Sequence, residues 1–297
     1  MPTRLRFEAN IADGTNAYID LGREMSKVQR KLVRQGQNFV VHGGLIQDSN
    51  NEYTLRFNTA PQSWVVGTAL RRAKKMWTMQ YAQVLKEGGL GRVKPKYWDW
   101  KVYLDDAMAA AQQLYAKDAA GVSFPDGEWN YSRYASEDVD WTAVGATSNR
   151  DADEFYAHIV GDHQGTSANW QSIGIIESWK DSRPKPDSDD PDIPGNGSDI
   201  RSDPLVNLFD EADADDERLE HLAQFGDQPP YFEDDVPGDG RTGLERMAMA
   251  ATSAANPIVP FNGFMAPHGL IQVAATQASG QGSVTILMDV EAVGGIY

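Results

Sequence analysis

Ser283-Val-Thr-Ile-Leu-Met-Asp-Val-Glu-Ala-Val293 is the stretch on which the fold depends. Every second residue from Val284 to Val290 is apolar, so these side chains share one face of an extended chain while the residues between them share the other. Two further apolar runs, at 258–265 and 270–275, precede it, separated by Gly, Pro, Ser and Asn. Period-two patterning with turn residues predicts antiparallel strands. Their partner strands must come from earlier in the chain.

The preceding sequence supplies those partners, interrupted by helices. Alternation predicts strands at 4–11 and 18–20, and two β-rich runs predict a hairpin of 38–47 with 52–58 across the turn Asp48-Ser-Asn-Asn51. Apolar residues spaced three and four apart predict a basic helix over 21–34 and a longer helix over 64–87, with Ser63 as its N-cap. We also expect an Ala-rich helix at 107–116 and strands at 94–104, 128–134, 154–160, 170–179 and 244–250.

Composition narrows the classes of protein. At 297 residues the chain can form one large domain or two ordinary ones, and it contains no cysteine. No apolar run is long enough to span a membrane, and the first residues lack the apolar core of a signal peptide. The net charge of −16 is uneven: residues 1–101 hold 17 Lys and Arg against 8 Asp and Glu, and residues 102–297 hold 10 against 35. This asymmetry indicates that the basic and the acidic part of the chain face different surroundings. The alternative is chance placement of charges on a solvated surface.

Residues 181–240 form an acidic insertion with 19 Asp and Glu against 4 Lys and Arg and many Pro and Gly. We expect an irregular surface insertion there. Its carboxylates include a cluster of hard oxygen ligands that suits Ca²⁺ between subunits. The spacing does not match an EF-hand, and a merely acidic loop is the simpler interpretation. The candidate Ca²⁺ ligands are Asp187, Asp189, Asp190 and Asp192.

The sequence lacks the phosphate-binding, dinucleotide-binding, zinc-protease and serine-hydrolase motifs. His158 and His163, near Asp153, Glu154 and Asp162, are the one basis for a metal-dependent hydrolase. Structural or exposed histidines are the ordinary alternative, so we expect a protein without enzymatic activity and without a resident cofactor. Basic residues on the predicted first strand and helices are candidates to face nucleic acid, the alternative being solvated surfaces. They are Arg4, Arg6, Lys27, Arg30, Lys31, Arg34, Arg71, Arg72, Lys74 and Lys75.

Several short sequence segments, called capsid-like phrases below, resemble segments of capsid proteins of small circular single-stranded DNA viruses from aquatic environments. They are Tyr18-Ile-Asp-Leu21, Lys27-Val-Gln-Arg-Lys-Leu-Val-Arg-Gln-Gly36, Thr59-Ala-Pro-Gln-Ser-Trp64, Lys94-Pro-Lys-Tyr-Trp-Asp-Trp-Lys-Val-Tyr-Leu104, Asp153-Glu-Phe-Tyr-Ala-His-Ile159 and the closing run from Val284. The strand layout likewise resembles a single jelly roll, mainly β, with inserted helices and a long acidic loop. The resemblance implies a virion protein, made in the host cytoplasm, that assembles in many copies into an icosahedral shell around a DNA genome.

The sequence departs from many such capsid proteins because it lacks an arginine-rich N-terminal arm. Contact with single-stranded DNA would then fall to folded basic surfaces or to a separate DNA-binding viral protein. A hypothesis from another class is a β-sandwich carbohydrate-binding or appendage module. Its sugar platforms would be the tryptophans Trp98, Trp100, Trp129 or Trp141.

Overall fold

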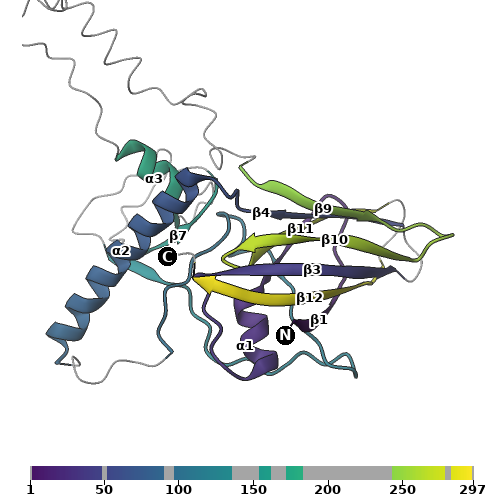
Figure 1. Ribbon diagram of the computed structural model, residues 1–297, viewed down its shortest axis with the longest axis horizontal. Coiled ribbons are helices and arrows are strands. Elements are labelled where there is room, and N and C mark those ends of the chain that lie inside the picture. The colour runs from purple at the N-terminus through teal and green to yellow at the C-terminus, as the bar shows by residue number, and fades with distance from the viewer. Residues whose placement is uncertain are drawn as a thin grey trace, which may run out of the picture. The chain divides into compact units, whose positions relative to one another are not determined.

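The protein is mainly β, with two sheets arranged as a sandwich and few helices (Figure 1). The computed structural model describes residues 2–48, 52–89, 97–135, 154–161, 172–182, 243–277 and 282–295. One sheet has the order β1 (Thr3–Ala9), β12 (Val284–Gly295), β3 (Gln37–Asp48) and β10 (Ile258–Pro267). The other has the order β5 (Gln112–Gln113), β2 (Asn16–Asp20), β11 (Leu270–Gln277), β4 (Tyr53–Thr59) and β9 (Glu245–Ala251).

The closing run of the sequence is β12, and its alternation matches its burial. Val284, Ile286, Met288 and Val290 are all completely buried, while Thr285, Leu287 and Asp289 lie on the other face. The strand pairs antiparallel with both β1 and β3. The prediction of three C-terminal strands with partners earlier in the chain is therefore confirmed.

The main strands pair in a nested order. β1 pairs with β12, β2 with β11, β3 with β10 and β4 with β9, all antiparallel. Consecutive strands thus alternate between the sheets, because β1 and β3 belong to one and β2 and β4 to the other. The predicted hairpin of 38–47 with 52–58 is therefore wrong. Both strands exist, but β3 and β4 lie in different sheets and hydrogen-bond to different partners.

Apolar side chains from both sheets meet in one core between the layers. Phe57 of β4 lies 4.7 Å, between ring centroids, from Phe261 of β10, and 6.0 Å from Phe264. All three rings are buried. Because these contacts join strands of different sheets, they hold the layers together by apolar burial rather than by backbone hydrogen bonds.

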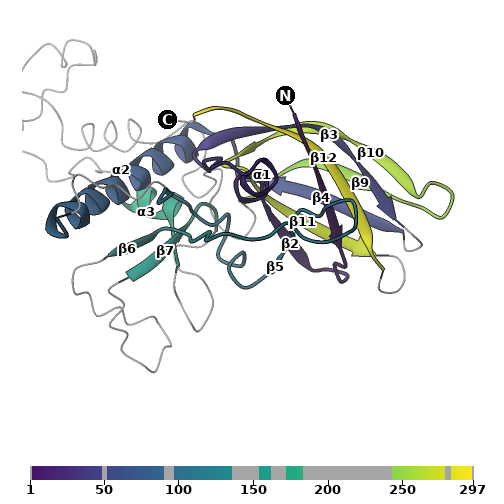
Figure 2. The same cartoon turned by 90° about the horizontal axis from the view of Figure 1, so that it is seen from below.

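Two helices are inserted among the early strands. α1 (Leu21–Gln29) begins where the Asp20 carboxylate accepts a hydrogen bond from the Arg23 amide at 3.0 Å. It ends at Arg30, whose left-handed backbone (φ 53°) turns the chain back, so the expected helix to residue 34 is too long. α2 (Trp64–Glu87) has the predicted bounds, with Ser63 as N-cap. In Figures 1 and 2, α2 extends away from the two sheets.

Between α2 and β9 the described chain has less regular structure than the sequence predicts. Residues 97–104 of the expected strand 94–104 form only an isolated bridge, Tyr103 with His158, and the expected Ala-rich helix is a series of turns that ends in β5. A small third sheet contains β6 (Arg133–Ala135), β7 (Glu154–His158) and β8 (Ser172–Gly174), followed by α3 (Ile175–Asp181). The expected strands at 128–134 and 170–179 are thus shorter, while those at 154–160 and 244–250 correspond to β7 and β9. The acidic insertion, after its first two residues, lies outside the described ranges.

Candidate interaction surface

The basic residues of β1 are paired with carboxylates on their own fold. Arg4 and Asp289 are direct cross-strand partners of β1 and β12, and two hydrogen bonds of 2.8 and 2.7 Å join them. These bonds lower the pKa of the Asp289 carboxyl. Arg6 forms an ion pair with Glu8, whose other carboxylate oxygen accepts a 2.9 Å hydrogen bond from Lys117. The positive charge of this strand is therefore largely neutralised within the chain.

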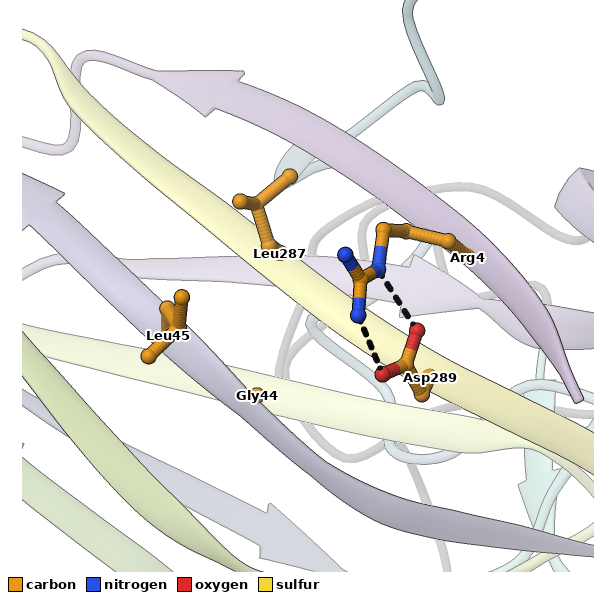
Figure 3. A pocket seen from close by; sticks show the side chains of 5 residues that line it. All are labelled: Arg4, Gly44, Leu45, Leu287 and Asp289. Carbon is orange, nitrogen blue, oxygen red and sulfur yellow. Dashed lines mark hydrogen bonds and ion pairs between the residues drawn. The ribbon is translucent and has the colours of Figure 1, made fainter.

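Figure 3 shows that the Arg4–Asp289 pair lines a surface hollow together with Gly44, Leu45 and Leu287. A side chain at Gly44 has no room, because a Cβ there would lie 2.1 Å from the Leu287 carbonyl oxygen. β3 and β12 therefore approach each other closely at Gly44. Its two charged groups satisfy each other, so it offers no unpaired charge to a ligand.

The expected basic face of α1 is also largely neutralised, by the segment that crosses it. Lys27 is almost buried and forms ion pairs with Glu24 and with Asp126 of the later segment. The ammonium of Lys27 also lies 4.5 Å from the centre of the Tyr115 ring. Arg34, beyond the helix, lies 3.0 Å from the carboxylate of Asp99. These cations therefore attach the segment that follows α2 to α1.

Arg30 and Lys31 differ from their neighbours. Both are exposed, and neither forms a side-chain ion pair with any residue that the structure describes. They lie where the chain leaves α1. Of the cations predicted on the first strand and helix, these two alone keep an exposed charge that no carboxylate within the described ranges offsets.

Another exposed cationic surface lies on α2. Arg71, Arg72 and Lys75 are exposed, and the half-exposed Lys74 is beside them. The Arg71 guanidinium donates a hydrogen bond to the Thr68 hydroxyl, 3.1 Å away on the same helix. The helix carries one carboxylate, Glu87, at its far end. The structure therefore groups the α2 cations as the sequence predicted.

The opposite side of α2 is held by the third sheet and by aromatic packing. The Tyr134 hydroxyl of β6 donates to the Ala73 carbonyl at 3.2 Å, and the Gln80 side chain bonds the backbone of Ala135 through both its amide atoms. Trp77 stacks on Tyr81 with ring centroids 5.1 Å apart. Trp77 and Tyr81 therefore pack within the protein, and the cationic face is left exposed.

A buried polar cluster around Asp20 escaped the sequence analysis. The Asp20 carboxylate, besides capping α1, accepts hydrogen bonds from the Trp129 indole at 3.0 Å and from the Tyr131 hydroxyl at 3.1 Å. The Trp129 ring in turn lies 4.6 Å from the ammonium of Lys101, whose pKa is lowered by burial. The cluster fixes the irregular segment against the sandwich. More than a hundred residues separate Asp20 from Trp129 and Tyr131, so no local sequence pattern indicates that they are hydrogen-bond partners.

A second polar group crosses the outer face of the β2–β11–β4 sheet. Tyr18, Gln272 and Asn58 are register neighbours on these three strands. The Asp105 carboxylate accepts hydrogen bonds from the Tyr18 hydroxyl at 2.7 Å and from the Gln272 amide at 3.1 Å. Burial raises the pKa of Asp105 to about 6. A largely buried carboxyl group with this pKa changes its charge just below neutral pH.

The predicted metal-binding positions are not brought together among the described residues. His158 is buried, and its Nδ1 lies 3.1 Å from the Ser172 hydroxyl, while His163 lies outside the described ranges. Another buried histidine, His268, packs edge-on against Trp100, and burial lowers its pKa to about 3. No group of three or more metal-ligating side chains occurs within the described part of the chain. The candidate Ca²⁺ ligands at 187, 189, 190 and 192 also lie outside it.

The tryptophans of the carbohydrate-binding hypothesis are mostly engaged within the fold. Trp100 is buried, and Trp129 is occupied by Lys101 and Asp20 as described above. Trp98 is 46% exposed, and its ring packs edge-on against Tyr81 with centroids 4.6 Å apart. Trp141 lies outside the described residues.

Comparisons with protein-family models, with curated proteins and with solved structures found no match. Among the described residues, no helix is long and apolar enough to cross a bilayer.

Proposed function

We propose that this protein is a viral capsid protein, a jelly-roll subunit that assembles in many copies into an icosahedral shell around a DNA genome. The observation that carries the proposal is the nested strand pairing. Eight strands, paired first with last and inward to β4 with β9, form two facing antiparallel sets of four, and the short β5 extends one of them. This is the connectivity expected of a jelly roll, an architecture common among viral capsid proteins.

The location of the capsid-like phrases supports the same proposal. The described parts of these phrases lie on β2, α1, the start of α2, the segment after α2, β7 and β12. They belong to one structural unit, formed by residues 1–180 and 237–297. Capsid subunits must also expose side chains that suit contacts between copies. α2 exposes Met76 and Met79 together with its cations, and Met and Arg are enriched in protein interfaces.

The carbohydrate-binding alternative receives less support. Lectin domains share the jelly-roll architecture, so the fold alone does not separate the two hypotheses. Sugar binding through tryptophan needs an open indole face. Of the three described tryptophans proposed for that purpose, only Trp98 is largely exposed, and it packs on Tyr81.

The proposal is tested by purifying the full chain by size exclusion and imaging the leading peak by negative-stain electron microscopy. We expect closed particles of uniform diameter. The ratio of absorbance at 260 nm to that at 280 nm on the same peak then reports packaged nucleic acid, and a low ratio would assign DNA binding to a separate viral protein. Repeating the separation with EDTA tests whether Ca²⁺ bridges subunits. A protein that stays monomeric across salt and pH would contradict the proposal.

A further inference from the structure

The exposed face of α2 is a continuous stripe of cations and methionines. Lys75, Met76 and Met79 follow Arg72 by three, four and seven residues, so their side chains lie on the same side of the helix as that of Arg72. Arg71 lies at the edge of this stripe and is counted as part of it. Met76 is 57% exposed and Met79 is 64% exposed. We call these five residues the α2 stripe.

The charge of the α2 stripe is opposite to that of the whole chain. α2 carries five Lys and Arg against one Glu, whereas the protein has a net charge of −16. The cations of β1 and α1 mostly meet carboxylates of their own fold, as Arg4 does with Asp289. In the stripe, Lys75 forms no ion pair with any described residue. A basic surface on an acidic protein is electrostatically attracted to the remainder of another copy.

The composition of the α2 stripe favours a protein partner over nucleic acid. Surfaces that bind single strands place aromatic rings between their cations so that bases can stack. Trp77 and Tyr81, the aromatic residues of α2 that follow the cations of the stripe, are instead stacked on each other, and the exposed Met76 and Met79 follow the cations along the same face. Exposed Met beside Arg is typical of protein interfaces. A strongly negative chain also repels a polyanion at long range.

We propose that the α2 stripe docks on an acidic surface of a second copy of this chain. Two stripes cannot meet each other, because like charges would face across the contact. The contact therefore pairs different surfaces of the two copies, either head to tail or reciprocally across a two-fold axis. This inference rests on the proposed function and specifies which element joins the subunits.

The test compares the wild type with two matched charge reversals. One variant carries Arg71→Glu and Lys75→Glu on the stripe. The control carries Arg30→Glu and Lys31→Glu, which change the net charge equally at two exposed cations near α1. A neutral variant with Arg71→Gln and Lys75→Gln guards against misfolding, and circular dichroism checks all four proteins. Light scattering after size exclusion, across protein concentration and at low and high salt, measures assembly.

We expect the stripe reversal to raise the concentration needed for assembly by about tenfold or more, and the control to assemble like the wild type. High salt should weaken wild-type assembly. If wild-type particles form and the stripe reversal assembles at the same concentration, the inference is wrong and the proposed function stands. If that variant assembles normally but loses nucleic-acid absorbance, the stripe contacts the genome instead of a subunit.

The remaining outcomes separate the inference from the proposed function. A wild type that forms open, concentration-dependent oligomers but no closed particles would contradict the shell. The inference would still stand if the stripe reversal abolished those oligomers. A wild type that is monomeric at every concentration and salt would overturn both.

Discussion

Replacing Asp105 by Asn should remove a pH-dependent part of the protein's stability. Asp105 is largely buried beside the outer face of the β2–β11–β4 sheet, where the Tyr18 hydroxyl and the Gln272 amide donate to its Oδ2. The backbone amide of Met108 donates to its Oδ1 at 2.9 Å. These hydrogen bonds favour the carboxylate, but burial outweighs them, and the neighbouring Asp106 adds to the effect, so the pKa rises from 3.8 to about 6.

The direction of the pH effect follows from this rise. Between pH 3.8 and 6 the folded protein keeps the Asp105 proton while the unfolded chain has lost it. The stabilising contribution of this group is therefore complete below about pH 3.8 and is lost as the pH rises through 6. A shift of about two pH units corresponds to about 3 kcal/mol. Residual exposure of the side chain reduces the expected change to about 2 kcal/mol.

The assay is urea unfolding followed by circular dichroism at a series of pH values from 4 to 8, for the wild type and for Asp105→Asn. The Asn side chain is uncharged at both acid and neutral pH. The free energy of unfolding of Asp105→Asn, relative to that of the wild type, should therefore rise by about 2 kcal/mol from acid to neutral pH. Glu128→Gln makes the same charge change at an exposed position and should show no such rise. A constant difference between Asp105→Asn and the wild type over this range would refute the argument.

Three further substitutions, two in the sandwich and one at the end of α1, are tested by the same unfolding measurement. Gly44→Ala should destabilise the protein by about 3 kcal/mol or more, because the new methyl group would lie 2.1 Å from the Leu287 carbonyl oxygen and 2.4 Å from the Phe261 ring; a loss below about 1 kcal/mol would contradict the close approach. Phe57→Ala should cost about 3–5 kcal/mol, because the ring contacts the opposite sheet, and a cost typical of surface sites would show that the sheets do not pack there. Arg30→Gly should stabilise the protein by about 0.5–1 kcal/mol, because φ is 53°; destabilisation would mean that the Arg30 side chain matters more than its backbone.

The alternation of the strands and the bounds of α2 could be predicted because their causes are local. The period-two pattern from Val284 to Val290 reports which face is buried, whatever the partner strand is. Likewise Ser63 satisfies a backbone amide three residues away, at Val66, and Gly88 follows directly after the last turn. The α2 cations were found together for the same reason, since helical spacing alone groups them.

The hairpin prediction failed because turn chemistry at residues 48–51 indicates only that the chain reverses there. Which sheet each strand joins depends on partners far away in the sequence, at β10 and β12 for β3 and at β9 and β11 for β4. The predictions for the segment after α2 were wrong for a similar reason. Its backbone groups bond to distant elements, as the Leu114 amide does to the Tyr18 carbonyl and the Tyr103 amide to the Ala157 carbonyl, so local propensity does not govern it.

Sequence alone therefore determined which side chains β12 buries, where α2 begins and ends, and how charge is divided along the chain. Tertiary structure decided which charges remain exposed. Lys27 and Arg71 are both helical cations in basic runs, yet Lys27 is nearly buried against Glu24 and Asp126, while Arg71 is exposed and donates to Thr68 on its own helix. The difference arises because an ion pair depends on distance in space. Asp126 lies about a hundred positions after Lys27, and only the folded chain brings the two together.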